Sequence, residues 1–410
     1  MLSPRIFRVN TTLLASFATV AFQFAPADDW PVFRGMDRNG IATDESFSSE
    51  GKITAVWKAE VGLGYSAPVV SGGKVVITGH NGADTDTVFC FDEKSGEELW
   101  TFSYPQPLAD LYFQGGTTGT LTFDGDKLFH VAREGEVFCL SVKDGSVIWK
   151  KHLQEEFGYS KPTWGFTGAP FVMGERVFLT AGESGIALNK NNGAEIWKSK
   201  NEEAGYSSPF PIKRGETQYL IFTNKRFYVC VEAATGEAVW EYRWMTRYGV
   251  NAADPVISGD KIFISSGYGK GAVMVSWDGS SDPVKIWQSR DLKTQMNAAV
   301  LIDGYLYGVD GNESVDGTGL KCLEFATGET QWIETSIGHG TVSAVGNQLV
   351  VLSESGTLQI GEASPSGFSP AVSEEVVPGR VWTVPVVANG RIYARNEGGQ
   401  LAVIEVGKDS

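Results

Sequence analysis

Short apolar segments separated by glycine-containing turns recur along most of this chain. Each unit opens with a small residue or proline, an apolar pair, a turn, and a second apolar segment. This pattern is typical of β-hairpins, because glycine adopts the positive φ that a tight turn needs at little cost. Eight openings of this kind begin at Ala67, Thr120, Ala169, Ser208, Asp254, Ala298, Val342 and Val384. The pattern predicts an all-β chain built from repeated units.

Seven tryptophans recur with these units, at intervals between 43 residues (Trp57 to Trp100) and 49 residues (Trp100 to Trp149). In most units a glycine lies four residues before the tryptophan, as Gly236 does before Trp240. Each such stretch reads as a strand, a turn and a second strand that ends on the tryptophan. A period in this range is typical of the four-stranded blades of a β-propeller.

The unit openings and the repeat tryptophans do not match in order at the two ends of the chain. Trp57 precedes the first opening, and the last unit ends near Val406 without room for an outer strand. We therefore expect residues 54–59 to supply the missing strand of the last blade, which removes exposed sheet edges. The seventh unit lacks a tryptophan; Val376 or Val377 falls near its place, after a longer hairpin over 362–374. The sequence predicts an eight-bladed β-propeller closed by N-terminal strand pairing with the last blade. A seven-bladed ring is the alternative, and it leaves one opening unexplained.

The N-terminus has the order of features found in secretory signal peptides. Arg5 and Arg8 precede a short apolar stretch over 12–24, and a small-x-small site at 25–27 follows. The alternative is a buried N-terminal strand or helix. We predict a signal peptide over 1–27, an N-terminal segment leading into the ring over 28–52, a propeller over 53–406 and a C-terminal tail over 407–410. A lipid anchor would need a cysteine near the cleavage site, and none is present there, so we expect no lipid anchor. No later segment is long and apolar enough to be transmembrane. We expect a periplasmic or secreted protein.

The charge balance narrows the classes of partner. The chain has 34 Lys and Arg against 49 Asp and Glu, a net charge of −15. Removal of 1–27, which holds two arginines and no acids, gives 32 against 49, or −17. An acidic surface repels nucleic acid and anionic membranes, and it attracts cations or basic partners.

The turn and strand before each tryptophan resemble the quinoprotein-like (PQQ-like) β-propeller repeat. Ser95-Gly96 before Trp100 and Thr327-Gly328 before Trp332 match its Thr/Ser-Gly-x-x-x-Trp hallmark, and the resemblance covers 53–406. It implies that each tryptophan docks between adjacent blades. Residues 30–40 are similar to a segment of secreted bacterial propellers of unassigned activity. The family includes PQQ-dependent dehydrogenases and BamB-type scaffolds, so its fold serves both an enzyme and a binding module.

Cofactor chemistry is not firmly implied by these residues. The dehydrogenases of the family carry an adjacent cysteine pair, a Ca²⁺ site and an Asp base, whereas this chain has isolated cysteines ten residues before a repeat tryptophan. They are Cys90, Cys139, Cys230 and Cys322. Equivalent positions in separate blades are too distant for a disulfide or a shared metal, so we predict four buried core thiols. PQQ and Ca²⁺ remain alternatives, and no pattern identifies a catalytic residue.

One acidic stretch has oxygen ligands at alternate positions, as calcium loops do. It runs from Asp310 to Asp316, but Lys321 stands where such a loop has its closing glutamate. A solvated polar hairpin is the other interpretation. The four histidines show no spacing typical of a metal site.

The segments just before the blade openings contain the candidate binding residues. In a propeller these segments lie near the axial channel, where ligands of this fold usually bind. The candidates are Tyr65, Trp164, Tyr206, Tyr248, Asn251, Asn297, His339 and Trp382. They either hold a flat ligand or a sugar ring, or they pack the blades together with glycines for close approach.

The leading functional hypothesis is an exported, non-catalytic propeller that binds a protein partner or a small ligand. It rests on a complete ring without a recognisable catalytic constellation. A PQQ-dependent oxidoreductase with its planar cofactor over the channel is one alternative, and a carbohydrate-binding propeller is another.

Overall fold

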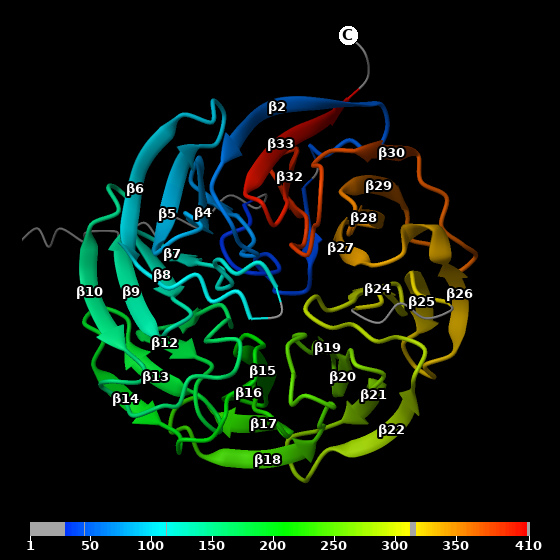
Figure 1. Ribbon diagram of the computed structural model, residues 1–410. Helices are drawn as coiled ribbons and strands as arrows, with labels where there is room; N and C mark the ends of the chain where they lie inside the picture. The colour runs from blue at the N-terminus through cyan, green and yellow to red at the C-terminus, as the bar shows by residue number, and fades with distance from the viewer. Residues whose placement is uncertain (1–28, 45, 112, 312–316, 408–410) are drawn as a thin grey trace, which may run out of the picture.

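The chain forms a ring of eight β-sheets around a central axis, as the computed structural model shows (Figure 1). The structure describes residues 29–407 except 45, 112 and 312–316. Across these residues we number the sheets as blades 1 to 8, from the innermost strand outwards. The predicted signal peptide over 1–27 and residues 408–410 of the predicted tail lie outside the described residues. The prediction of an eight-bladed propeller is confirmed, and the seven-bladed alternative is wrong.

The first four blades each consist of four consecutive antiparallel strands. Blade 1 contains β3 (Val69–Ser71), β4 (Lys74–His80), β5 (Thr85–Asp92) and β6 (Glu98–Pro105). Blade 2 contains β7 (Thr122–Asp124), β8 (Lys127–Val131), β9 (Glu136–Ser141) and β10 (Val147–His152). Blade 3 contains β11 (Phe171–Met173), β12 (Arg176–Leu179), β13 (Ile186–Asn189) and β14 (Glu195–Lys198). Blade 4 contains β15 (Phe210–Arg214), β16 (Thr217–Thr223), β17 (Phe227–Glu232) and β18 (Ala238–Arg243).

The second half of the ring repeats this order until the last blade. Blade 5 contains β19 (Val256–Ser258), β20 (Lys261–Ser266), β21 (Gly271–Ser276) and β22 (Val284–Ser289). Blade 6 contains β23 (Val300–Ile302), β24 (Tyr305–Val309), β25 (Leu320–Glu324) and β26 (Thr330–Glu334), followed by the 3₁₀ helix η1 (Thr335–Ile337). Blade 7 contains β27 (Gly340–Val345), β28 (Gln348–Ser353), β29 (Thr357–Glu362) and β30 (Val372–Glu375). Blade 8 contains β31 (Val386–Ala388), β32 (Arg391–Arg395), β33 (Gln400–Gly407) and, as its outer strand, β2 (Lys52–Glu60).

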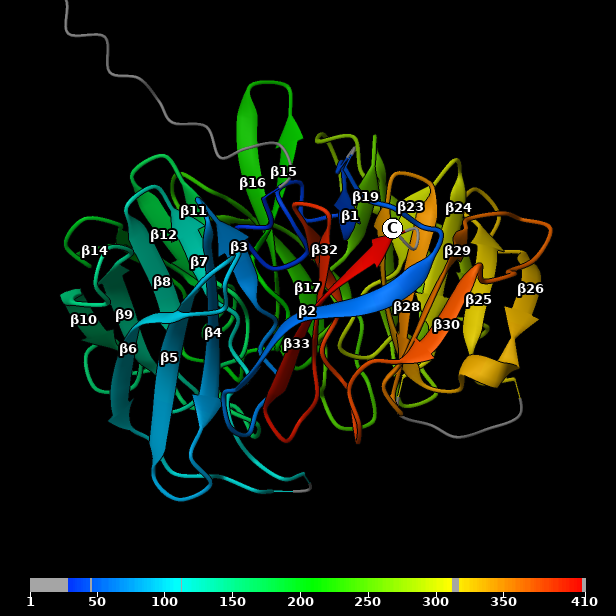
Figure 2. The same ribbon diagram turned by 90° about the horizontal axis from the view of Figure 1, so that it is seen from above.

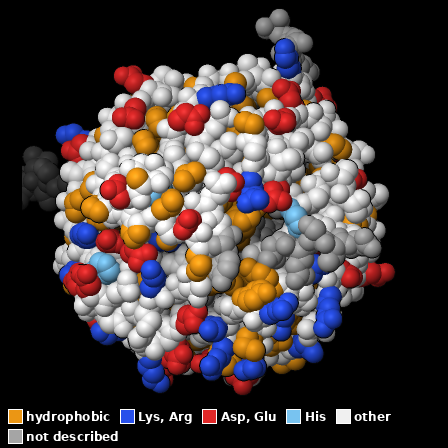
Figure 3. All heavy atoms as spheres, viewed as in Figure 1, with side chains coloured by type: hydrophobic (Ala, Val, Ile, Leu, Met, Phe, Trp, Pro, Cys, Tyr) orange, Lys and Arg blue, Asp and Glu red, His pale blue; other side chains and the backbone are white. Residues whose placement is uncertain are grey.

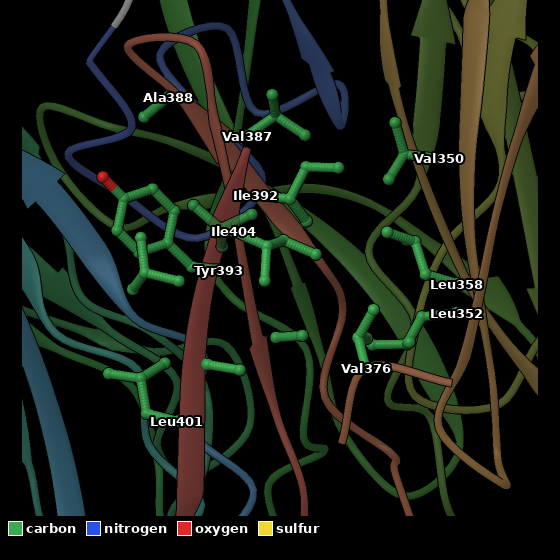
Figure 4. Packing of buried hydrophobic residues seen from close by; sticks show 14 of the residues in the cluster. Val350, Leu352, Leu358, Val376, Val387, Ala388, Ile392, Tyr393, Leu401 and Ile404 are labelled. Atoms are coloured by element: carbon green, nitrogen blue, oxygen red, sulfur yellow. The ribbon is translucent and has the colours of Figure 1, made fainter. Parts of the chain in front are cut away.

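Pairing of β2 with β33 closes the ring as the sequence predicts. The two strands run antiparallel, with Trp57 opposite Val403. Blades 7 and 8 then share an apolar interface (Figure 4), in which blade 7 residues such as Val350, Leu352 and Leu358 lie across from Ile392 and Ile404 of blade 8. Burial of these aliphatic side chains supplies the main force that holds neighbouring blades together.

Most of the repeat tryptophans join their blade to the next one. The Trp100 indole donates from Nε1 to the carbonyl of Val142 in blade 2 at 3.1 Å, and Trp149 donates to Lys190 in blade 3 at 2.9 Å. The indole ring lies against the turn glycine of the next blade, as Trp100 lies against Gly145. The glycine is therefore required twice, for positive φ and for the close approach of the ring. Trp57 donates to Glu93 in the same way, so the contact also crosses the point of closure.

The segment over residues 29–44 forms an N-terminal plug across one end of the axis (Figure 2). It contains β1 (Ile41–Ala42), which adds to β27 as a parallel fifth strand. Hydrogen bonds connect the plug to the blades. They join Trp30 to Val70, Pro31 to Phe123, Arg34 to Ala298 and Ala299, Gly40 to Ala344, and Asp44 to Gly390. The plug thus contacts blades 1, 2, 6, 7 and 8. We call its side of the ring the plug face and the opposite side the loop face.

Candidate functional site

The predicted binding residues lie on the loop face and form three groups, of which the second and third are joined by a hydrogen bond from the backbone N–H of Tyr206 to the carbonyl of Asn251 at 2.8 Å. The first group is an aromatic stack between blades 8 and 1. The rings of Tyr65 and Trp382 are stacked, with centroids 5.3 Å apart and an interplanar angle of 29°. The ring of Phe113 is tilted against that of Tyr65, with centroids 5.5 Å apart. The local reason is that both Tyr65 and Trp382 directly precede an innermost strand, and these strands converge on the axis.

Charged groups fix the orientation of this stack. The Trp382 indole donates from Nε1 to Glu354 Oε1 at 2.7 Å, and the Tyr65 hydroxyl donates to Glu397 Oε2 at 3.0 Å. Arg380 lies over the Trp382 ring, 5.2 Å from its centroid, and forms ion pairs with Glu354 at 3.5 Å and Glu397 at 3.7 Å. Burial, followed by the Glu397 carboxylate, raises the pKa of Tyr65 well above its ordinary value. The hydroxyl therefore stays protonated at neutral pH.

Two further candidates join this first group from blades 6 and 7. The Asn297 amide donates from Nδ2 to the carbonyl of Trp382 at 3.1 Å, across the position of blade 7. His339 lines an open hollow of about 500 Å³ together with Ile337, Glu354, Ser355, Gly379 and Arg380. Four of the eight predicted residues thus come together. The loop face is hollowed near its centre (Figure 3).

The second group is a pair between blades 3 and 4. The Trp164 and Tyr206 rings meet edge to face with centroids 5.8 Å apart, and the Trp164 amide makes a long contact of 3.5 Å with the Tyr206 hydroxyl. Tyr206 is only 9% exposed, and its backbone carbonyl accepts from Thr167 Oγ1 at 3.1 Å. These contacts favour a role in packing the two blades.

The third group lies at the connection of blades 4 and 5. Tyr248 is 52% exposed and meets Tyr268 edge to face, with centroids 5.0 Å apart. Asn251 nearby is fully buried, and its amide donates to the carbonyls of Asn224 at 2.9 Å and Trp244 at 2.7 Å. Its donors are occupied by backbone, which favours a structural role for this residue. Tyr248 is instead displayed to solvent.

A buried polar chain between blades 1 and 2 was not foreseen from the sequence. The Tyr104 hydroxyl lies 2.7 Å from His130 Nε2 and 3.2 Å from Asp86 Oδ2. Burial raises the pKa of Asp86 from 3.8 to about 7, against the opposing effects of the Tyr104 hydrogen bond and the Arg133 charge. Burial also lowers the pKa of His130 to about 3. No motif marks these residues, because they are separated along the chain and meet only where two blades pack.

Replacing Asp86 by asparagine is expected to flatten the pH dependence of stability. The folded chain holds the Asp86 proton more tightly than the unfolded chain, so this stabilisation is complete below about pH 4 and is lost as the pH rises through about 7. The wild type should therefore lose about 1–3 kcal/mol between pH 5 and 8 through this group. Urea unfolding of both proteins at the two pH values measures the difference. Equal slopes for the wild type and D86N would refute the assignment.

The cysteine prediction is confirmed. All four cysteines are free and buried, each in a different blade.

Within the described range no three His, Cys, Asp or Glu side chains are placed to hold a metal ion. Asp310, the first residue of the predicted calcium loop, pairs with Lys321 at 2.6 Å and Lys293 at 3.7 Å, while 312–316 lie outside the described residues. Two ammonium groups at this carboxylate disfavour Ca²⁺, and the isolated thiols do not match the adjacent pair of the quinone enzymes. The described residues therefore do not fit PQQ with Ca²⁺. In the part of the chain that the structure describes, no helix is long and apolar enough to cross a membrane.

Comparison with known proteins places the fold and the repeat in one family. The chain is 26% identical to the outer membrane protein assembly factor BamB of Burkholderia pseudomallei over 358 residues, which is 74% of this chain and 86% of the relative. It is 28% identical to the quinoprotein ethanol dehydrogenase of Pseudomonas aeruginosa over 170 residues, 36% of this chain and only 25% of the length of that enzyme. The crystal structure of BamB from Moraxella catarrhalis superposes with a TM-score of 0.62 at 15% identity, covering 88% of this chain and 99% of that one. A family model described as outer membrane protein assembly factor BamB matches residues 84–334, well over half of the chain. The chain therefore belongs to the BamB-type family of PQQ-like β-propellers.

Proposed function

We propose that this chain is an exported, non-catalytic propeller that binds a protein partner through its loop face. The observation that carries the proposal is the exposure of large apolar side chains on the connections of that face. Tyr248 is 52% exposed, Leu111 47%, Met245 44% and Met296 37%. Large apolar side chains displayed together on loops are a feature of protein interfaces.

The structure of the ring supports this assignment. The plug occupies one end of the axis, so the loop face is the open end. The aromatic stack near its centre is held by carboxylates and Arg380, and its phenol stays protonated. Relatives of this chain are named as assembly factors, which fits a protein that acts through protein contacts.

Carbohydrate binding is the second candidate, and the hollow at the aromatic stack favours it. His339, Glu354 and Arg380 line about 500 Å³ of open space, and the Trp382 indole adjoins it through its hydrogen bond to Glu354; an aromatic ring beside polar groups is a composition that sugar sites share. A glycan array with the wild type and W382A separates the two functions. Retention of one glycan by the wild type and its loss in W382A would assign carbohydrate binding.

A photo-reactive amino acid in place of Tyr248 is expected to cross-link a specific protein in extracts of the native envelope. The same group in place of Leu99 serves as the control, since Leu99 is 45% exposed but lies on the outer strand β6. Irradiation followed by electrophoresis and mass spectrometry should yield an adduct from position 248 and none from position 99. Absence of any adduct from the loop face would overturn the proposed function.

A further inference from the structure

Five cations that form no ion pair with any described residue lie on the loop face of blades 4 and 5. We call them the cationic patch: Arg226, Arg243, Arg247, Lys270 and Arg290. The ion pairs found among the described residues involve none of the five. The four arginines are exposed and Lys270 is half-buried. The four arginines therefore present their charge to solvent, whereas the Lys270 ammonium lies 4.3 Å from the centroid of the Trp244 ring.

The strand order of the two blades brings these residues together. Arg243 ends β18 opposite Phe227, the residue that follows Arg226. Lys270 directly precedes β21, whose second residue, Ala272, pairs with Ser289 at the end of β22, next to Arg290. Burial, together with the Arg243 and Arg290 charges, lowers the pKa of Lys270. Blades 4 and 5 thus hold like charges close enough to repel one another.

The charge of the patch is opposite to that of the chain as a whole. The chain has a net charge of −15, yet the acids next to the patch have other partners. Glu203 pairs with Lys225 at 2.8 Å. Asp291, which accepts a hydrogen bond from Thr330 at 3.0 Å, keeps its charge but offsets only one of the five cations. A cluster of unpaired cations destabilises the isolated protein through mutual repulsion, and a complementary anionic partner relieves that repulsion.

Exposed apolar side chains adjoin the patch. The Arg247 guanidinium lies 5.4 Å from the centroid of the Tyr248 ring, and the Tyr248 ring contacts that of Tyr268. The Tyr268 hydroxyl accepts from Gln295 Nε2 at 3.0 Å, next to Met296 in the following connection. In Figure 3, apolar side chains lie beside a group of Lys and Arg below the centre of the loop face. Tyr, Met and Arg together are the residue types enriched in protein interfaces.

We infer that the cationic patch, with Tyr248 and the adjacent methionines, binds an acidic segment of a protein partner that also carries apolar side chains. The inference deepens the proposed function and rests on it. Charge complementarity selects an anionic partner, and the exposed tyrosine and methionines select one with apolar groups. A membrane surface or a nucleic acid is anionic over a wider area and would also meet the acidic remainder of this chain. A short acidic segment meets only the patch.

The test uses the full mature chain and a fluorescent peptide in which glutamates alternate with leucines. Fluorescence anisotropy should show binding that weakens about tenfold or more when the salt concentration rises from about 0.05 to 0.5 M. The double variant R243E/R290E should lose about tenfold or more in affinity, and Y248S should lose affinity without changing the salt dependence. The control K285E reverses an exposed charge on β22 of the same blade and should bind as the wild type does. Circular dichroism and the unfolding midpoint verify that each variant is folded.

The outcomes separate this inference from the proposed function. No binding of the peptide, or equal binding by R243E/R290E, overturns the role of the patch. Equal or tighter binding of phosphatidylglycerol vesicles or of a DNA oligonucleotide overturns the assignment to a protein segment. If the partner cross-linked from position 248 is captured equally by R243E/R290E, the scaffold function stands and the patch is excluded from it.

Discussion

Replacing Gly236 by alanine is expected to lower the free energy of unfolding by about 3–5 kcal/mol, because the added methyl group meets a buried indole that joins two blades. A Cβ at Gly236 would lie 2.6 Å from Cδ2 and Cε3 of Trp197, and the backbone there has a φ of +77°. The ring cannot move aside easily. It is 8% exposed, packs against Phe178 and Phe222, and donates from Nε1 to the carbonyl of Ala233 at 3.1 Å.

The matched control for this change is Gly215→Ala in the same blade. Gly215 also has positive φ, at +55°, but nothing lies within 4 Å of the position that its Cβ would take. Alanine at this position should lower the free energy of unfolding by only about 1–2 kcal/mol, which is the cost of positive φ for a residue with a Cβ. Urea unfolding followed by tryptophan fluorescence measures both variants. Equal destabilisation of G236A and G215A would show that the turn glycines serve the backbone alone and that the docking of Trp197 contributes little.

The second large effect is expected in the plug. Replacing Arg34 by glutamine should lower the free energy of unfolding by about 3–5 kcal/mol, because it leaves buried carbonyl groups without a donor. Arg34 is 1% exposed and donates to Ala298 at 2.8 Å, Asn39 at 2.8 Å and Ala299 at 2.9 Å. Burial lowers its pKa to about 10, with Asp254 opposing the shift, so the side chain stays charged at neutral pH. Glutamine is too short to bridge the plug and blade 6.

Arg38 provides the control for this prediction. It is as buried as Arg34, at 3% exposure, but no hydrogen-bond partner of its guanidinium is found among the described residues. Replacing Arg38 by lysine keeps a cation in front of the buried Asp254 carboxylate and removes no hydrogen bond found among the described residues, so it should change stability by no more than about 1 kcal/mol. Limited proteolysis gives an independent measure, as R34Q should expose residues 29–44 to cleavage and R38K should not. Comparable losses in the two variants would mean that the hydrogen bonds of Arg34 do not determine how the plug is held.

The candidate site was only partly predictable. Tyr65 and Trp382 were predicted as neighbours of the axis because each precedes an innermost strand, and the structure shows that their rings contact each other. Their stacking on one another, and the separation of Trp164 and Tyr206 into a different blade pair, depend on the rotation of each blade about the axis. The sequence of a single repeat does not indicate how its blade is rotated. Asn251 resembled the other candidates in sequence, yet its amide is taken up by the backbone of the same connection.

The position of the cationic patch could not be predicted from the sequence either. The composition predicts an acidic surface that would attract basic partners, and the total charge is indeed negative. Arg226 and Arg290 are far apart in the chain and belong to different blades, so no charge run marks them. Adjacent blades bring them to one face, where their sum reverses the sign that the composition predicts.

The sequence alone determined the number of blades, the closure of the ring by the strand around Trp57, and the burial of four separate thiols. These properties follow from a local pattern that repeats, because each blade makes the same hairpins and the same tryptophan contact with its neighbour. Only the tertiary structure decided where residues 29–44 lie, which aromatic side chains meet, and where unpaired charge gathers. Those properties depend on single contacts between segments far apart in the chain, and no periodic pattern records them.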